Sequence, residues 1–392
     1  MPLRRKRAIV AAAAAVCAVS TACSPSLEMT TASVPDASQA VVNGQFLGQQ
    51  EVDFRSALVM QSEQGRLTSV AIVDPEGNSI PGELRNGGTE WHVPPRSLQM
   101  ATDYTVTAAA VDRYGTATQT ESAFTTMLPS NVNDYSFSLS EGGTYGVGMP
   151  LSVRFNKPVV DRAAVEQRLD LQTSVPVEGS WSWIGERTVT FRPKEYWPAG
   201  TQVSVQANLR GVETEPDLFV LEDKGMSFNI GSSFIAVVDA ETHTMTVTRD
   251  GEVVRTMPIT TGKEGWETRS GIKVIMSKVR NIVMDAGTLG VSEDDPEYYR
   301  LDVEYALRIT TSGEFVHAAP WSVDSHGEEN VSHGCVGMSM DNAAWYYSNA
   351  KVGDVVQVTN TGRRQNLGNG ITVWNESWDS WLAGSAVGQP TA

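Results

Sequence analysis

Cysteine is the residue type in shortest supply in this sequence, with only Cys17, Cys23 and Cys335 among 392 residues. A scaffold of paired disulfides, which needs cysteines in even number throughout a domain, is therefore excluded. Basic residues are also few, 30 against 46 acidic ones, for a formal net charge of −16, and no basic run follows the first seven residues. This balance argues against nucleic acid as a partner.

Charged residues make up 19% of the chain and hydrophobic residues 41%, so the sequence is neither a disordered polymer nor a bundle of membrane helices. Glycine and proline are frequent, and only one long helix-like stretch follows the N-terminal region. Short strand-like segments between turn residues predict a mainly β fold. The length is typical of two or three domains.

The first 22 residues have the features of a secretory signal peptide. Basic residues at positions 4–7 precede the small and apolar run Ala8–Val19, which is too short to cross a bilayer. Ala22 directly before Cys23 resembles a lipoprotein signal, in which the cysteine is acylated and becomes the new N-terminus. Plain cleavage is the alternative, because Ser20 stands where such signals usually carry Leu.

We therefore expect an exported protein, held by a lipid on Cys23 at the outer face of the cell membrane and facing the cell wall. Residues 23–40 are rich in Ser, Thr, Ala and Pro, which predicts a flexible tether after the lipidated N-terminus.

Two segments, residues 41–128 and 129–231, each have strand-like runs spaced as in a β-sandwich. Pro95–Ala108 resembles Pro193–Ala207, which indicates a duplicated domain. Both segments resemble bacterial immunoglobulin-like modules, and we expect them to be spacers. Sugar binding by aromatic residues such as the Trp181-Ser182-Trp183 run is the alternative, although core packing is the commoner use of such residues.

Residues 232–359 are predicted to form a third, β-rich domain, followed by a tail at 360–392. Three tryptophans in this tail, Trp374, Trp378 and Trp381, predict packing onto a neighbouring domain. The predicted elements of the third domain are the strand Phe234–Val238, a hairpin turning at Asp250-Gly251, a helix over Met340–Lys351 capped by Ser339, and the strand Val355–Val358.

Three histidines precede Cys335 by 18 residues or fewer in the sequence: His317, His326 and His333. An imidazole can serve as the base for a thiol and, once protonated, favours the thiolate. In Ser332-His333-Gly334-Cys335 the glycine leaves room for a substrate carbonyl to approach the backbone N–H groups. The pattern predicts nucleophilic catalysis by Cys335.

The sequence His317-Ala318-Ala319-Pro320-Trp321 and the later Ser332-His333-Gly334-Cys335 resemble the active-site signature of the L,D-transpeptidases, exported enzymes that cross-link peptidoglycan. The match extends from about Phe234 to Val358, and the preceding immunoglobulin-like pair and the Trp-rich tail resemble the multi-domain members.

The resemblance implies a reaction with two substrates. A cysteine attacks the carbonyl of the third residue of a tetrapeptide stem, releases D-Ala, and passes the acyl group to a diamino acid of a second stem, which gives a 3→3 cross-link. It also implies that no cofactor is needed, that carbapenems inactivate the enzyme, and that L,D-carboxypeptidase trimming is a side activity.

The resemblance further assigns residue roles. Cys335 is the nucleophile, His317 is the base, and the backbone carbonyl of Ala318 orients the imidazole. Tyr299 assists an oxyanion hole formed by the backbone of Gly334 and Cys335. The remaining assigned positions shape the loop around the thiol (Ser332, His333) or line the substrate pocket (Met284, Trp321).

Two positions that we also place at the substrate site depart from the family pattern. Gly337 stands where many members have Arg or Asn, and Leu289 occupies a lid position where close relatives carry Tyr. We expect an altered rate or inhibitor response with the chemistry intact. The nearby acidic residues Glu293–Asp295 and Glu297 are interpreted as a solvated loop, with attraction for a substrate amine as the alternative.

Four other functions remain as alternatives. The three histidines and Cys335 could ligate zinc, but no short paired spacing of metal-ligand type is present. A papain-like peptidase would place its cysteine before its histidine, and a sortase would need a downstream arginine, where only Arg363 and Arg364 follow. The fourth alternative is a degenerate module that binds peptidoglycan without turnover.

Overall fold

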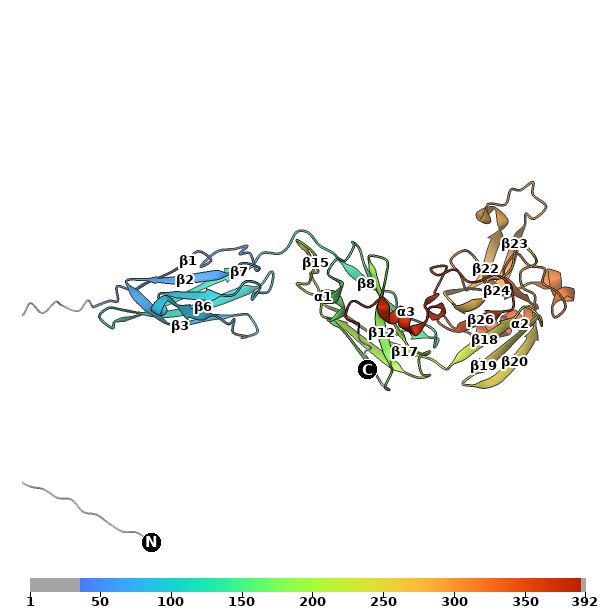
Figure 1. Cartoon of the computed structure of the whole chain (residues 1–392), viewed down its shortest axis with the longest axis horizontal. Helices are drawn as coiled ribbons and strands as arrows, with labels where there is room; N and C mark the ends of the chain where they lie inside the picture. The colour runs from blue at the N-terminus through green and yellow to red at the C-terminus, as the bar shows by residue number, and fades with distance from the viewer. Residues whose placement is uncertain (1–35, 389–392) are drawn as a thin grey trace, which may run out of the picture. The chain divides into compact units, whose positions relative to one another are not determined.

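The structure, a computed structural model, describes residues 36–388 (Figure 1). The predicted signal peptide, Cys23 and most of the predicted tether lie outside these residues. The chain divides into two compact units: one holds the chain up to Leu98 with Thr102–Thr126, and the other holds Gln99–Ala101 with the chain from Met127 onward. The prediction of a mainly β fold is confirmed. Within residues 36–388, no helix has the length and apolar character needed to cross a membrane.

The first unit is a sandwich of two antiparallel sheets. One sheet has the order β1-β2-β5-β4, with strands Val41–Gly44, Leu58–Glu63, Glu90–Val93 and Glu83–Arg85. The other has the order β3-β6-β7, with strands Gly65–Val73, Asp103–Asp112 and Ala117–Thr125, and a 3-10 turn, η1, spans Asn86–Gly88. Alternate residues of β6 are buried, as expected for a strand with one face on a core. Phe124 fills that core between Phe46 and Tyr104, with ring centroids 5.1 Å from each.

The second unit begins with a sandwich of the same design. Its sheets have the orders β8-β10-β13-β12 (Tyr135–Phe137, Leu151–Phe155, Thr188–Pro193, Gly179–Ile184) and β11-β14-β17-β9 (Leu169–Thr173, Gln202–Ala207, Lys224–Ile230, Thr144–Tyr145). The short elements α1 (Arg162–Glu166), β15 (Glu213–Glu215) and β16 (Leu218–Phe219) complete it. Strand order matches between the sandwiches, with β2, β5 and β6 in the places of β10, β13 and β14. This shared order supports a duplication.

Trp181 and Trp183, which look exposed in the sequence, are buried in the second sandwich. The Trp183 indole donates to the buried Glu166 carboxylate at 3.2 Å, and the Trp181 ring meets Phe191 edge to face. Core packing therefore explains this aromatic run, and neither ring is available to stack on a sugar.

The rest of the second unit contains two further sheets. One has the order β20-β19-β18-β26-β21, with strands Glu252–Pro258, Thr244–Arg249, Phe234–Asp239, Val355–Thr359 and Gly271–Val274. The other has the order β22-β23-β24-β25, with strands Ser277–Asp285, Arg300–Arg308, Phe315–Ala318 and Val336–Met338. The helical segments are α2 (Met340–Asn349), α3 (Trp378–Ala383) and the 3-10 turns η2 (Ala286–Leu289), η3 (Pro320–Ser325) and η4 (Val373–Asn375).

Local sequence signals explain two of these elements. Asp250 and Gly251 both have positive φ, 50° and 90°, as a two-residue hairpin turn between β19 and β20 requires. Ser339 accepts the backbone N–H of Asn342 and so caps α2. The helix ends at Asn349 rather than at the predicted Lys351, because the backbone at residue 350 is already extended.

The tail packs onto the second sandwich through one buried arginine. The Arg192 guanidinium lies 5.0–5.2 Å from the ring centres of Trp374, Trp378 and Trp381. The Trp381 indole donates to the Ser180 carbonyl at 3.0 Å. Cation–π contacts gain strength when desolvated, so this cluster holds the tail against strands β12 and β13.

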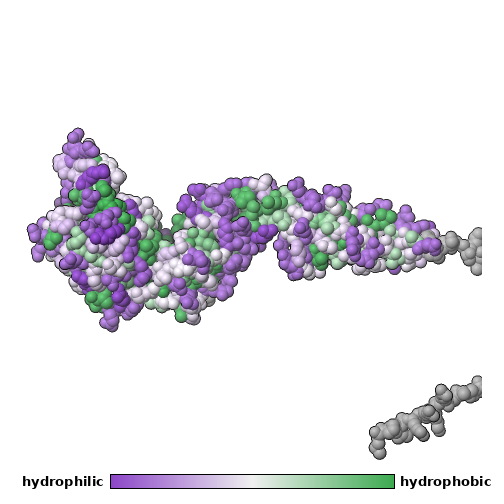
Figure 2. All heavy atoms as spheres, turned by 180° about the vertical axis from the view of Figure 1, so that it is seen from behind, coloured by the Kyte–Doolittle hydropathy of each residue, from purple (hydrophilic) through white to green (hydrophobic). Residues whose placement is uncertain are grey.

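Strands β22 and β23 form a long ribbon that projects beside β24 (Figure 1). The loop at residues 286–299 joins the two strands and includes the acidic run. The tip that projects from this part of the molecule is hydrophilic, as Figure 2 shows.

Candidate active site

The pairing of two short strands brings the predicted nucleophile and base together. Strands β24 and β25 run parallel, with His317 in register with Gly337. Cys335 directly precedes β25. The eighteen-residue separation in sequence thus becomes a short separation in space, and both residues line one cavity.

The Cys335 side chain is buried, with 9% of the residue exposed. Its Sγ lies 3.7 Å from the carbonyl oxygen of Gly313. Burial raises the pKa of the thiol to about 11, against the lowering effects of the Phe315 backbone N–H, Lys273 and Arg308. At neutral pH the resting nucleophile is therefore a thiol that needs a base.

The His317 imidazole is buried and oriented by the backbone. Its Nδ1 lies 2.7 Å from the carbonyl oxygen of Ala318. Because a carbonyl only accepts, Nδ1 carries the hydrogen, and Nε2 is the basic nitrogen of the neutral ring. Burial lowers the pKa of His317 to about 4, and Trp321 stacks on the ring with centroids 6.0 Å apart. The imidazole is thus neutral at pH 7 and ready to accept a proton.

Ser332 braces the loop that presents the thiol. Its hydroxyl donates to the Cys335 carbonyl at 2.6 Å and accepts the Gly334 N–H at 3.1 Å. Gly334 has φ of 110°, a conformation that side chains rarely adopt. The Gly334 N–H, an expected oxyanion donor, is therefore engaged with Ser332 in this state.

His333 and Tyr299 form the side of the site nearest the 286–299 loop. Their rings lie 4.9 Å apart, and Trp266 contacts His333 from another direction at 5.0 Å. Burial raises the pKa of Tyr299 to about 12, so its phenol stays protonated and can donate a hydrogen bond. The His333 Nε2 lies 2.6 Å from the carboxylate of Glu297.

Glu297, which the sequence places in an acidic loop, reaches the site through its contact with His333. Its carboxylate also accepts the Lys263 ammonium at 2.6 Å, and these two partners lower its pKa. It ties the 286–299 loop to the loop that carries Cys335. The carboxylate is therefore already paired, which disfavours a role in attracting a substrate amine. The sequence did not predict these two pairings, because the partners are 34 and 36 residues away.

A cavity of about 240 Å³ opens onto these groups. Among the predicted site residues, those that line it are Met284, Tyr299, His317, Trp321, Ser332, His333, Cys335 and Gly337. Ala318 and Gly334 act only through their backbone. Leu289 ends η2, and its side chain lies outside the described part of the structure.

The described residues 36–388 contain no group of three or more His, Cys, Asp or Glu placed to hold a metal ion. His326 lies instead beside Ser322, with its Nε2 at 3.3 Å from the serine hydroxyl. The arrangement as a whole is that of a thiol nucleophile with a backbone-oriented imidazole base.

Comparison with known proteins decides the family. A model of the L,D-transpeptidase catalytic domain matches residues 233–358, and a model of the bacterial Ig domain matches residues 49–213. L,D-transpeptidase 2 of Mycobacterium tuberculosis is 38% identical over 324 residues, which cover 82% of this chain and 79% of that protein. The chain belongs to the L,D-transpeptidases.

Two further relatives agree. L,D-transpeptidase 5 of Mycobacterium tuberculosis is 32% identical over 336 residues, covering 84% of this chain and 73% of that protein. The solved structure of the LD transpeptidase LdtMt1 in complex with imipenem covers 59% of this chain and all of its own, with 40% identity and a TM-score of 0.51. The resemblance drawn from the histidine and cysteine motif is thus confirmed.

Gly337 fits tightly in this L,D-transpeptidase. A Cβ atom there would lie 3.0 Å from the Cβ of Ala319 and 3.1 Å from Cγ2 of Thr260. Backbone bonds from Thr260 to Gly337, 2.9 Å in each direction, hold the two chains together. A residue with a side chain at position 337 therefore requires a shift of its neighbours, and glycine keeps this wall of the cavity open.

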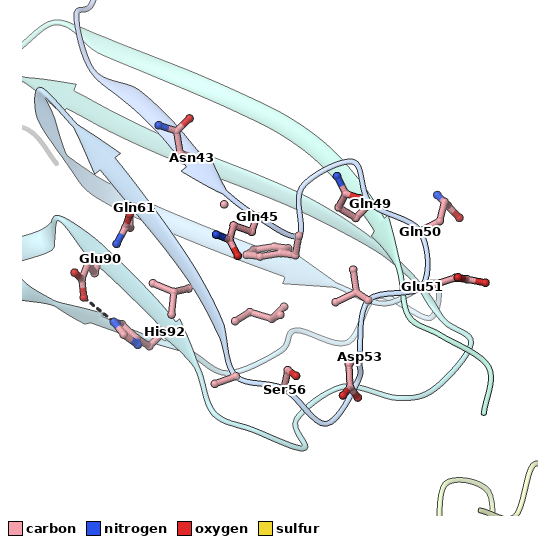
Figure 3. Close-up of a pocket in the computed structure, with 16 residues that line it drawn as sticks. Asn43, Gln45, Gln49, Gln50, Glu51, Asp53, Ser56, Gln61, Glu90 and His92 are labelled. Atoms are coloured by element: carbon pink, nitrogen blue, oxygen red, sulfur yellow. Dashed lines mark hydrogen bonds and ion pairs between the residues drawn. The ribbon is translucent and has the colours of Figure 1, made fainter. Parts of the chain in front are cut away.

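A second hollow lies in the first unit of this L,D-transpeptidase (Figure 3). It is an open groove of about 830 Å³ lined by amide side chains such as Gln45, Gln49 and Gln61. The one ion pair drawn there joins His92 to Glu90 at 2.8 Å. No cysteine lines it, so it has no part in thiol chemistry.

Proposed function

We propose that this L,D-transpeptidase forms 3→3 cross-links between peptidoglycan stem peptides through a thioester on Cys335. The observation that carries the proposal is the 2.7 Å bond from His317 Nδ1 to the Ala318 carbonyl, which leaves Nε2 as the base beside a buried thiol.

In the first half-reaction, His317 Nε2 takes the proton of the Cys335 thiol as the sulfur attacks the carbonyl carbon of the third residue of a tetrapeptide stem. A carbon–sulfur bond forms, and the carbonyl oxygen gains negative charge. When the peptide bond breaks, the imidazolium returns the proton to the amine of the leaving D-Ala. The product is a thioester between the stem and Cys335.

In the second half-reaction, the side-chain amine of a diamino acid on another stem attacks the thioester. His317 takes the proton of this amine, the carbon–sulfur bond breaks, and the sulfur regains a proton. Water in place of the amine gives simple trimming of the donor. The neutral state of His317 at pH 7 suits it to act as the base in both halves.

We assign the oxyanion donors to the Tyr299 hydroxyl and to the backbone N–H groups of Cys335 and Gly334. The Gly334 N–H becomes available when its 3.1 Å bond to the Ser332 hydroxyl is exchanged for one to the substrate oxygen. Removing one such donor typically costs about 3–4 kcal/mol of transition-state stabilisation. Tyr299→Phe is therefore expected to slow acylation by about two to three orders of magnitude without changing the fold.

The test is product analysis with a disaccharide-tetrapeptide as both donor and acceptor. The unchanged chain is expected to release D-Ala and form a dimer linked between third residues, and Cys335→Ala is expected to form neither. Ser325→Ala, at the far end of η3, is the matched control. Binding of the peptide with no product from the unchanged chain would instead support a degenerate wall-binding module.

We also propose that carbapenems acylate Cys335, because the relative LdtMt1 was solved in complex with imipenem. Opening of the lactam by the sulfur would add the whole inhibitor mass to the protein. An inhibitor adduct on any residue other than Cys335, or none at all, would argue against the assignment.

Localisation and domain roles complete the proposal. We propose that a lipid on Cys23 anchors the protein to the membrane. Cys23→Ala is expected to release the protein from the membrane fraction.

We also propose that residues 41–128 and 129–231 are spacers that carry the domain at 232–359 towards the wall. Deletion of residues 41–128 is expected to preserve activity on soluble muropeptides and to reduce cross-linking in cells.

A further inference from the structure

A buried cluster of charges lies behind the nucleophile and has no part in the mechanism above. Lys273 on β21 has a side chain that is 0% exposed, and its ammonium lies 2.5 Å from the carboxylate of Glu314. Arg269 donates to the other oxygen of Glu314 from both its backbone N–H at 3.1 Å and its guanidinium at 2.8 Å. Desolvating a lysine completely is costly, and hydrophobic residues usually serve stability as well. Such a cluster calls for a functional reason.

Glu314 connects this cluster to the thiol through the backbone. It stands between Gly313, whose carbonyl oxygen lies 3.7 Å from the sulfur of Cys335, and Phe315, whose backbone N–H lowers the pKa of that thiol. Its side chain also packs behind the loop, since a Cβ placed on Gly334 would lie 3.9 Å from its Cγ. Glu314 thus contacts both Lys273 and the loop that carries Cys335.

In this cluster a lysine and an arginine share one carboxylate, so the cluster is positively charged when Lys273 is protonated. The charged and titratable groups that act on the sulfur come from several elements. They are Lys273 on β21, Arg308 and Tyr299 at the two ends of β23, Glu314 at the start of β24, and His317 within β24. Of these, Lys273 is the fully buried cation, where charge acts with the least screening.

We propose that Lys273, held by Glu314 and Arg269, is a positioning residue of the reaction, a buried cation that favours the thiolate of Cys335 and the negative charge of the tetrahedral intermediate. The burial that raises the pKa of the thiol also makes a nearby fixed positive charge effective. Burial lowers the pKa of Lys273, and the ion pair with Glu314 opposes this effect and so favours the charged lysine. Glu314 also belongs to the backbone segment that contacts the sulfur through Gly313.

The test measures the thiol directly and does not depend on the peptide substrate. Cys17→Ser and Cys23→Ser leave Cys335 as the single thiol of the full chain, and its alkylation by iodoacetamide is followed by mass spectrometry from pH 7 to 12.5, a range that includes both expected midpoints. Lys273→Gln is expected to raise the midpoint of the pH profile by about one unit. At pH 7 alkylation slows about threefold, because a tenfold smaller thiolate fraction is partly offset by higher intrinsic nucleophilicity.

Two comparisons separate this role from structural support. Glu314→Gln breaks the same ion pair as Lys273→Gln, so both variants are expected to unfold at a lower temperature. Glu314→Gln removes a negative charge, however, and is therefore not expected to raise the midpoint of the alkylation profile. Lys194→Met, at the exposed pair with Glu178, is the control that leaves both readouts unchanged.

An unchanged midpoint in Lys273→Gln, or an equal rise in Glu314→Gln, would overturn the proposal. Should Lys273→Gln fail to fold, Lys273→Met takes its place, because methionine keeps most of the side-chain length without the charge. A raised midpoint in Lys273→Met supports the role, and an unchanged midpoint overturns it. Failure of transpeptidation with a normal alkylation profile would count against the proposed function alone.

Discussion

The burial of His317 predicts an enzyme that keeps working in acid. The pKa of this imidazole, about 4, lies well below the ordinary value of 6.5, which corresponds to about 3 kcal/mol in favour of the neutral ring. Burial is the main cause, and the positive charge of a protonated His326 is a smaller one. Since the base must be neutral to accept the thiol proton, the acidic limb of kcat/KM for acylation is expected near pH 4.

Trp321→Ala is the perturbation that tests this cause. The ring stacks on His317 at 6.0 Å while 51% of Trp321 is exposed, so it separates the imidazole from solvent. Removal of the indole admits water to one face of the His317 imidazole only, because β24 and the loop before β25 still cover the other face. We expect the pKa of His317 to rise by about one unit and the acidic limb to move with it.

Two assays follow the change. Acylation rates of Cys335 from pH 3.5 to 7.5 give the acidic limb of the pH profile. NMR of the histidine Cε1–H resonances gives the pKa of His317 without turnover. Trp266→Ala removes a ring from His333 instead and is expected to leave the limb in place. An acidic limb near 6.5 in the unchanged chain would refute the reasoning, as would a Trp321→Ala limb that does not move.

Three further predictions concern stability and the 286–299 loop. Burial raises the pKa of Asp354 to about 7 from 3.8, so the folded state binds the proton more tightly than the unfolded state, and stability is lost as pH rises from about 4 to 7. Asp354→Asn is expected to abolish this loss, which is about 3 kcal/mol between pH 5 and pH 8, in urea unfolding measured at those two values. An equal gain in stability at both values would exclude the carboxyl as the cause. Gly337→Ala is expected to lower the free energy of unfolding by about 1–3 kcal/mol, because the new methyl group crowds Thr260. Thr260→Ser removes the crowded methyl group of the threonine and is expected to recover part of this loss in a double-mutant cycle. Glu297→Gln is expected to speed hydrogen exchange across residues 286–299 by releasing Lys263 and His333, and unchanged exchange would show that this loop is held by other contacts.

Local patterns predicted much of this molecule because their signals lie within a few residues. The turn at Asp250 and Gly251 and the cap at Ser339 depend on local backbone chemistry, and both appear in the structure. The histidine and cysteine of the sequence motif also lie at one site in the structure, because parallel pairing of two short strands brings the two ends of the motif together.

Contacts between distant segments were beyond sequence reasoning. Lys273 and Glu314 are 41 residues apart, and each alone reads as an ordinary surface charge. The sequence indicates that Glu297 is part of a solvated acidic loop, because its partners Lys263 and His333 lie in other loops. Charge pairing across a fold carries no periodicity in the sequence, so only the structure identifies which charges are buried together.

The central claim is that Cys335 carries the acyl group during the reaction, and the mass of the intact protein tests it most directly. The full chain with Cys17→Ser and Cys23→Ser is mixed with a disaccharide-tetrapeptide and quenched in acid within seconds. We predict a mass increase equal to the donor less D-Ala, mapped to the peptide containing Cys335 and absent in Cys335→Ala. Release of D-Ala by Cys335→Ala, or an adduct on another residue, would contradict the account.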